Sequence, residues 1–255
     1  MDKNGKHRIV GEKKDISYED VRKFFDERGS QEKKHLYNYV MYLDNNPEVA
    51  IERDRQGKEG IDKIIKIDSS MRVLDVRCGV GRWGEYFLDK GAYYVGIDGN
   101  NMMIERAENN LKQYNNKKLF LCSLQNIDEL IEENKELSNF DFIFVSGVLM
   151  YLNDEDCLNV MKCFNKLCNR NSKICIIESM SNNERLTLDN FYSNDLNQDY
   201  SAIYRTVNEY KEIMEKAFSE KFNLKMEKLL DFEDGLQKRR EHVTMEHCFI
   251  WEKKY

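Results

Sequence analysis

The feature that most constrains the fold is residues 72–84, which read Arg-Val-Leu-Asp-Val-Arg-Cys-Gly-Val-Gly-Arg-Trp-Gly. An apolar stretch reaches Val76 and runs directly into a glycine-rich turn, after which apolar residues return with helical spacing. Strand, tight turn and helix in this order build a nucleotide site at the carboxyl end of the first strand of an α/β sheet. Gly79 and Gly81 let the backbone approach a ligand, and the helix start offers free N–H groups. The segment therefore predicts an α/β fold with a ligand at this turn.

A second apolar run, residues 92–97, ends at Asp98, which Gly99 follows. An acidic residue at the tip of the second strand can accept hydrogen bonds from both hydroxyls of a ribose. The alternative is that Asp98 caps the helix expected to begin near Asn101, because Asp, Asn and Gly all favour helix starts. Both roles are compatible, and the order and spacing of the elements favour the ligand role.

Three motifs together resemble the first, second and fourth motifs of the class I S-adenosylmethionine-dependent methyltransferases. They are Val-Leu-Asp-x-x-Cys-Gly-x-Gly-Arg-Trp-Gly at 73–84, Val-Gly-Ile-Asp at 95–98, and Phe-Asp-Phe-Ile-Phe-Val-Ser-Gly-Val-Leu-Met-Tyr-Leu at 140–152. The resemblance covers roughly residues 65–180. It implies a Rossmann-like α/β fold, a mostly parallel seven-stranded sheet with an antiparallel C-terminal hairpin, and S-adenosylmethionine as the cofactor.

The rest of the chain alternates between strand and helix patterns, which predicts a parallel sheet with helices on both faces. We expect an N-terminal helical cap over residues 1–66, of which 1–16 are polar and loose. The core is expected over 67–255, with an acceptor-side insertion at about 179–206. Strands are predicted at 71–76, 92–97, 118–122, 140–145, 173–178, about 222–231 and 243–253, and helices at 18–28, 47–66, 82–89, 101–113, 125–136, 154–169 and 207–218.

The resemblance assigns a cofactor site to the carboxyl ends of the strands. Asp75 and the turn after it correspond to the end of the pocket that holds the amino-acid part of the cofactor, and Asp98 corresponds to the ribose ligand. The segment after the third strand would lie along the adenine, and the turn after the fourth would line the methionine side. The cofactor-binding candidates are Asp75, Arg77, Gly79, Gly81, Asp98, Gly99, Ser123, Leu124 and Ser146.

Arg77 departs from the family, which usually has the first of three glycines at this position. Glycine allows a positive φ there, which arginine tolerates less well. Three interpretations stay open. The turn can keep an ordinary conformation, with Arg77 facing solvent or pairing with the cofactor carboxylate. The site can be weakened in a degenerate relative, or the substitution can be particular to this sequence.

The acceptor side is less well defined. An oxygen acceptor needs a base to take its proton, and Glu178 ends the fifth strand at the edge where ligands bind in such folds. Its alternative role is to cap a loop or helix. Segment 192–210 resembles the acceptor-side insertions of bacterial small-molecule methyltransferases, and tyrosine with arginine suits a sugar, phosphate or carboxylate. The acceptor-binding candidates are Tyr192, Tyr200, Tyr204 and Arg205, which could instead form a packed loop.

Composition narrows the function further. The net charge of −6 disfavours a nucleic-acid partner, and no run approaches eighteen apolar residues. Seven cysteines without zinc-site spacing predict a reducing, cytoplasmic setting and no metal. We therefore expect methyl transfer to a small polar acceptor, a sugar hydroxyl first. The alternatives are N-methylation of an amino sugar or amino acid, a non-catalytic ligand-binding relative, and a nucleic-acid methyltransferase. The nucleic-acid alternative is disfavoured, because this sequence has no Asn/Asp-Pro-Pro-Tyr-like motif after the fourth strand.

Overall fold

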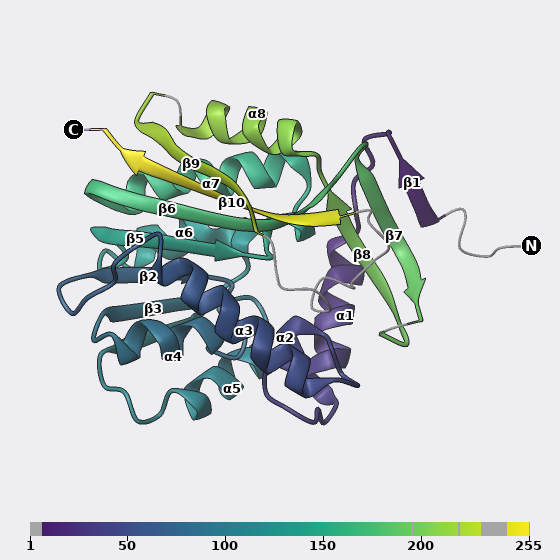
Figure 1. The fold of residues 1–255 in the computed structure, drawn as a ribbon, viewed down its shortest axis with the longest axis horizontal. Helices are drawn as coiled ribbons and strands as arrows, with labels where there is room; N and C mark the ends of the chain where they lie inside the picture. The colour runs from purple at the N-terminus through teal and green to yellow at the C-terminus, as the bar shows by residue number, and fades with distance from the viewer. Residues whose placement is uncertain (1–6, 195, 219, 231–243, 255) are drawn as a thin grey trace, which may run out of the picture.

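The computed structural model describes residues 7–194, 196–218, 220–230 and 244–254. Its centre is a seven-stranded sheet in the order β4-β3-β2-β5-β6-β10-β9 (Figure 1). Strands β4 to β6 in that order are parallel, whereas β10 is antiparallel to both of its neighbours. The predicted Rossmann-like methyltransferase fold is confirmed. The strands are β2 Arg72–Val76, β3 Tyr93–Asp98, β4 Lys117–Leu121, β5 Phe140–Ser146, β6 Cys168–Ser181, β9 Phe222–Leu230 and β10 Thr244–Lys253.

Helices cover both faces of this sheet, so its central strands are largely buried and mostly apolar. One core lies between the sheet and helices α6, α7 and α8, and a second lies on the face that carries α3 and α4 (Figure 1). Both predicted C-terminal strands are present, although their expected ends at 231 and 243 lie outside the described residues. The core helices are α4 Arg82–Asp89, α5 Asn101–Asn110, α6 Ile127–Glu133, α7 Asp154–Leu167 and α8 Val207–Phe218, with short 3-10 helices η2 Leu124–Asn126 and η3 Leu149–Tyr151.

A second sheet was not predicted. It joins β1 (Arg8–Val10), β7 (Leu186–Ser193) and β8 (Gln198–Tyr204) in an antiparallel arrangement at one end of the molecule (Figure 1). The expectation that residues 1–16 are loose is therefore wrong for Arg8–Val10; residues 1–6 lie outside the described chain. Three residues show no readable periodicity, and their partner strand follows almost 180 residues later, so local patterns could not reveal this pairing.

The first two N-terminal helices lie near the carboxyl end of the main sheet, and the third extends over the face that also carries α4 (Figure 1). Ser17 caps the first of them by accepting a hydrogen bond from the Asp20 N–H, and Pro47 begins the third. The first helix packs against β8 and α5 and so connects the small sheet to the core. The three helices are α1 Tyr18–Ser30, α2 Asn38–Met41 and α3 Pro47–Asp62.

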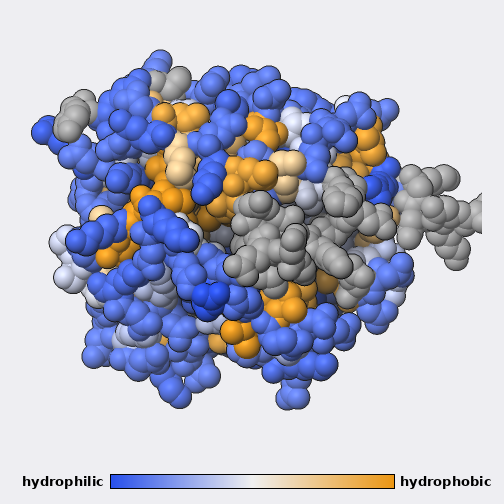
Figure 2. All heavy atoms as spheres, viewed as in Figure 1, coloured by the Kyte–Doolittle hydropathy of each residue, from blue (hydrophilic) through white to orange (hydrophobic). Residues whose placement is uncertain are grey.

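The molecular surface is hydrophilic around its periphery, and apolar side chains gather toward the middle of the face seen in Figure 2. Among the described residues, no helix combines the length and the apolar composition that crossing a bilayer requires.

Candidate active site

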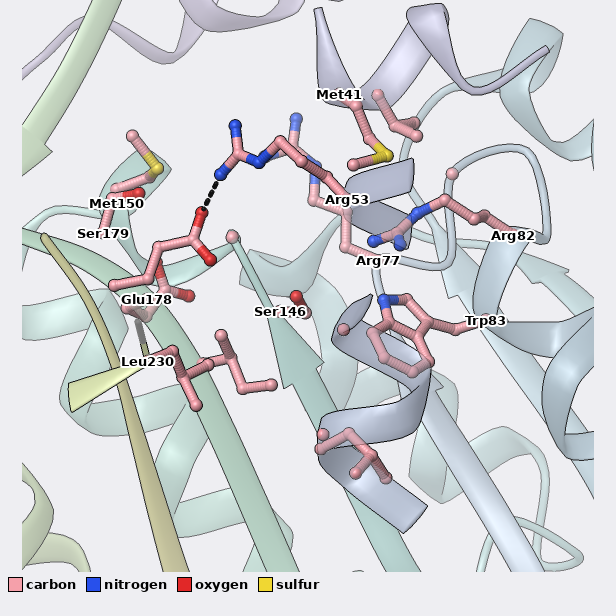
Figure 3. A pocket seen from close by; sticks show the side chains of 18 of the residues that line it. Met41, Arg53, Arg77, Arg82, Trp83, Ser146, Met150, Glu178, Ser179 and Leu230 are labelled. Atoms are coloured by element: carbon pink, nitrogen blue, oxygen red, sulfur yellow. Dashed lines mark hydrogen bonds and ion pairs between the residues drawn. The ribbon is translucent and has the colours of Figure 1, made fainter. Parts of the chain in front are cut away.

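A cavity of about 1130 Å³ opens at the carboxyl ends of β2, β3, β5 and β6, beneath the N-terminal helices (Figure 3). Eight of the residues that the sequence singles out line it: Asp75, Arg77, Gly79, Asp98, Ser146, Glu178, Tyr200 and Tyr204. The others lie outside its lining: Gly81, Gly99, Ser123, Leu124, Tyr192 and Arg205.

The glycines of the first turn are required by packing. Gly79 has φ +55°, and a Cβ atom there would lie 2.6 Å from the Val40 side chain of α2. Gly81 has φ +77°, and a Cβ atom would lie 2.9 Å from Leu111. The first glycine thus lets the N-terminal helices approach the turn, and the second lets the segment after α5 pack against it.

Asp98 has a structural role and also keeps hydrogen-bond acceptor positions for a ligand. Its Oδ2 accepts from the Gly79 N–H and its Oδ1 from the Asn100 N–H, each at 2.9 Å. Each carboxylate oxygen has a second lone pair, so two acceptor positions remain. Asn100 itself caps α5, through a hydrogen bond from the Met103 N–H, so Asp98 is not the helix cap. Burial raises the pKa of Asp98, and the positive charge of Arg77 and the backbone N–H donors partly oppose that shift.

Asp75 is buried at the end of β2 and accepts a hydrogen bond of 2.8 Å from the Tyr94 hydroxyl. Burial raises the pKa of Asp75 to about 7, although Tyr94 and the positive charge of Arg82 act in the opposite direction. A cation entering the cavity would favour the ionised carboxylate. Asp75 can therefore hold an ammonium group.

Glu178 is 1% exposed and has two different carboxylate oxygens. Oε1 accepts from the backbone N–H groups of Val148 and Leu149, at 2.7 and 2.8 Å, and so caps η3. Oε2 has no hydrogen-bond partner among the described residues. Burial raises the pKa of Glu178 to about 7, against the opposing effect of the two N–H donors. The side chain fits the capping role through one oxygen and leaves the other able to accept a proton.

Arg77 keeps the left-handed backbone of the glycine it replaces, with φ +64°. The interpretation that the turn relaxes to an ordinary conformation is therefore wrong, and this conformation costs about 1–2 kcal/mol for a residue with a Cβ atom. The side chain neither faces solvent freely nor pairs with a carboxylate of the described chain. Its guanidinium carbon lies 4.0 Å from the ring centre of Phe25 and 4.6 Å from that of Tyr151.

Four tyrosines of the cavity wall form a chain of hydroxyl contacts that begins beside Arg77. Tyr151 contacts the Tyr42 hydroxyl and, at 3.2 Å, the Tyr200 hydroxyl, which in turn lies 3.1 Å from that of Tyr204. Burial raises the pKa of Tyr42 to about 12 and that of Tyr151 well above its usual value, so both stay protonated donors. The sequence indicated Tyr200 and Tyr204 but missed Tyr42 and Tyr151, although the first belongs to an aromatic cluster and the second to the β5 motif.

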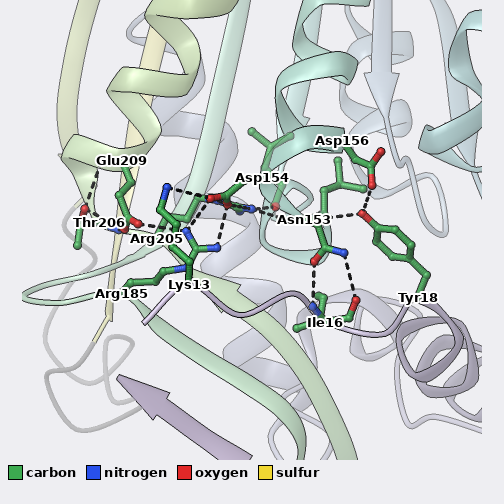
Figure 4. A network of polar contacts seen from close by, with 12 residues as sticks. Lys13, Ile16, Tyr18, Asn153, Asp154, Asp156, Arg185, Arg205, Thr206 and Glu209 are labelled. Atoms are coloured by element: carbon green, nitrogen blue, oxygen red, sulfur yellow. Dashed lines mark hydrogen bonds and ion pairs between the residues drawn. The ribbon is translucent and has the colours of Figure 1, made fainter. Parts of the chain in front are cut away.

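Arg205 has partners other than an acceptor. It is fully buried, and its Nε donates to Asp154 Oδ1 at 2.8 Å (Figure 4). Its other nitrogens donate to the carbonyls of Leu149 and Leu152, at 2.9 and 2.6 Å. Because Glu178 holds the N–H side of η3, Arg205 and Glu178 together fix this loop from both ends.

The remaining predicted residues lie around the cavity rather than on its wall. A Cβ atom at Gly99 would lie 3.3 Å from Ser123, so the tips of β3 and β4 approach closely there. Leu124 is buried in the core. Tyr192, which is 40% exposed, donates to Asn197 in the turn between β7 and β8.

Comparison with known proteins agrees with this fold. Residues 74–174 match the family described as "Methyltransferase domain". A tRNA (uracil(54)-C(5))-methyltransferase from Pyrococcus horikoshii is 28% identical over 133 residues, which are 52% of this chain and only 30% of that relative. The 1,6-didemethyltoxoflavin-N1-methyltransferase of Burkholderia thailandensis, solved with S-adenosylhomocysteine, superposes with a TM-score of 0.63 at 14% identity over 97% of this chain and 96% of that one. The [4+2]-cyclase SpnF superposes with a TM-score of 0.58 at 11% identity, over 78% and 81% of the two chains.

The fold is that of the class I S-adenosylmethionine-dependent methyltransferases. Residues 74–174 of this chain match a methyltransferase domain, and a protein of the same fold has been solved with S-adenosylhomocysteine.

Proposed function

We propose that this protein transfers a methyl group from S-adenosylmethionine to a hydroxyl of a small polar acceptor, with a sugar as the acceptor class. The observation that carries the proposal is Glu178 Oε2, a buried carboxylate oxygen on the cavity wall without a partner among the described residues. A pKa of about 7 suits a general base near neutral pH.

The bound cofactor supplies an activated methyl group on a sulfonium. The chain's residues then bind and orient the cofactor and the acceptor, and they exclude water from the cavity. Asp98 offers two carboxylate positions for the ribose hydroxyls, and Asp75 offers a negative charge for the ammonium. Ser146, at the end of β5, lines the methionine side. With the cofactor bound, Glu178 Oε2 would take the proton of the acceptor hydroxyl, and the methyl group would pass from the sulfonium, which leaves as a neutral thioether, to the hydroxyl oxygen.

The acceptor is proposed to lie against the tyrosines. The hydroxyls of Tyr151, Tyr200 and Tyr204 combine donor and acceptor capacity, as a sugar's hydroxyl groups do, and their rings offer apolar faces. Tyr192 and Arg205 are left out of this proposal, because their polar groups are engaged elsewhere.

The second candidate is N-methylation of an amino sugar or amino acid. It is favoured by the likeness to an N1-methyltransferase that covers 97% of this chain. A neutral amine needs little base catalysis, so the two candidates differ in their dependence on Glu178. The net charge of −6 disfavours nucleic acid as the acceptor.

Calorimetric titration with S-adenosylmethionine and S-adenosylhomocysteine tests the cofactor site first. Micromolar binding that Asp98→Ala abolishes, while Asp89→Ala at the distant end of α4 leaves it intact, would support the proposal. Sugar nucleotides and their amino counterparts are then compared as acceptors by release of S-adenosylhomocysteine. A folded protein that binds neither compound would reject the function and favour a non-catalytic relative.

A further inference from the structure

Arg77 is an arginine of the cavity wall with no carboxylate partner among the described residues. The other arginines of this wall each have one, in the pairs Arg53–Glu246, Arg55–Glu52 and Arg82–Asp54. A guanidinium that faces a cavity without a counter-ion favours a negative charge in that cavity. This contrast indicates that the ligand supplies the negative charge that pairs with Arg77.

The guanidinium is held in place rather than mobile on a long side chain. It stacks against Phe25 from α1 and against Tyr151 from η3, at 4.0 and 4.6 Å from the two ring centres. Stacking uses the flat faces of a guanidinium and leaves the N–H groups at its edge available for a planar or tetrahedral oxyanion. The left-handed backbone at Arg77 is strained, and glycine would adopt it more easily. The arginine side chain is therefore present despite a cost in backbone strain.

Hydroxyl donors surround the same place. Tyr151, which contacts Arg77 through its ring, also joins the hydroxyls of Tyr42 and Tyr200. Asp98 is near enough for Arg77 to lower its pKa, yet it forms no ion pair with Arg77 and instead accepts from backbone N–H groups. A guanidinium together with hydroxyl groups is a combination that binds carboxylates and phosphates.

We propose that Arg77 binds a carboxylate or phosphate oxyanion of the ligand in this cavity, assisted by the Tyr151 hydroxyl. The proposal rests on the proposed function, because that function assigns the cavity to cofactor and acceptor. The oxyanion has two possible sources, the carboxylate of the cofactor or an anionic group of the acceptor. In the second case the acceptor is a sugar phosphate, a nucleotide sugar or a sugar acid.

The cofactor source is tested by calorimetry with S-adenosylhomocysteine and with 5′-methylthioadenosine, which lacks the amino-acid part. The variants are Arg77→Asn, which tolerates a positive φ, and Arg77→Lys, which keeps the charge. If Arg77 binds the cofactor carboxylate, Arg77→Asn weakens S-adenosylhomocysteine at least tenfold and leaves 5′-methylthioadenosine unchanged. Arg77→Lys then recovers part of the loss.

The acceptor source is tested on the protein saturated with S-adenosylhomocysteine, with inorganic phosphate as the probe. If Arg77 binds an acceptor oxyanion, millimolar phosphate raises the melting temperature of the wild type and of Arg77→Lys, and not that of Arg77→Asn. Sodium chloride at equal ionic strength controls for screening.

Arg106→Asn is the matched control for a purely structural role. Arg106 also stacks on an aromatic ring of the N-terminal helices, 4.1 Å from the centre of Tyr39, but it lies outside the cavity lining. Equal losses in Arg106→Asn and Arg77→Asn, or unchanged binding in both assays, would overturn the proposal. Failure of the wild type to bind S-adenosylhomocysteine rejects the proposed function instead, and the phosphate assay on the unliganded protein still tests Arg77.

Discussion

The two halves of the cavity are built in different ways. The half proposed to bind the cofactor (the cofactor half) comes from one short stretch of chain, since Asp75, Gly79 and Asp98 lie within 24 residues and a backbone-to-carboxylate hydrogen bond joins Gly79 to Asp98. The half proposed to bind the acceptor (the acceptor half) is assembled by side chains from α1, η3, β8 and the end of α2, which meet only after the N-terminal helices dock. The first half is therefore set by local geometry and the second by tertiary packing.

Removing the unpartnered oxygen of Glu178 is the strongest test of this division. In Glu178→Gln the Oε1 atom still caps η3, but the general base is lost, so turnover of a hydroxyl acceptor should fall about 10³-fold. Calorimetry should give an unchanged affinity for S-adenosylhomocysteine. Glu246→Gln, at another carboxylate of the wall, is the control and should lower turnover little. Equal turnover in Glu178→Gln and the wild type would instead favour an amine acceptor.

The same substitution should change stability in a pH-dependent way. The pKa of Glu178 rises from 4.5 in the unfolded chain to about 7 in the fold, so its contribution to stability is full below pH 4.5 and is lost as pH rises through 7. Glu178→Gln should therefore match the wild type near pH 4.5 and exceed its unfolding free energy by about 3 kcal/mol at pH 8. Urea titrations at both pH values measure this. A difference that is constant with pH would contradict the assigned ionisation.

Local sequence patterns were sufficient to predict the core of the fold. They were insufficient to predict the segments that cover it. The strand that ends at Asp98 and the turn at Gly79 follow from spacing, because each is fixed by its chain neighbours. Strand β1 could not be predicted, because its partner is distant and the three residues carry no pattern. Tyr151 lies within a recognised motif, but its role depends on Tyr42 and Tyr200, which other segments contribute. Arg205 shows the reverse error, since its residue type suits an acceptor while its partners are the η3 carbonyls.

Asp75 should make cofactor affinity depend on pH. With a pKa of about 7 it is mostly neutral at pH 5.5 and largely ionised at pH 7.5, and only the carboxylate attracts the ammonium. The affinity for S-adenosylhomocysteine should thus rise about tenfold across this range. Asp75→Asn should flatten the profile at the weaker value. A wild-type profile as flat as that of the variant would place the ammonium elsewhere.

The smallest expected effect belongs to a single hydroxyl of the acceptor half. Tyr151→Phe keeps the ring against Arg77 and removes the oxygen that links Tyr42 to Tyr200, so two neighbouring hydroxyls lose a partner. One hydrogen bond contributes about 1 kcal/mol, and we expect the acceptor KM to rise about fivefold with little change in cofactor affinity. Tyr86→Phe, which loses a hydrogen bond to Asp62 outside the acceptor half, controls for general loss of stability. If Tyr151→Phe instead weakened cofactor binding and left the acceptor KM unchanged, the division between the two halves would be wrong. The hydroxyl chain would then belong to the cofactor half, although tertiary packing assembles it.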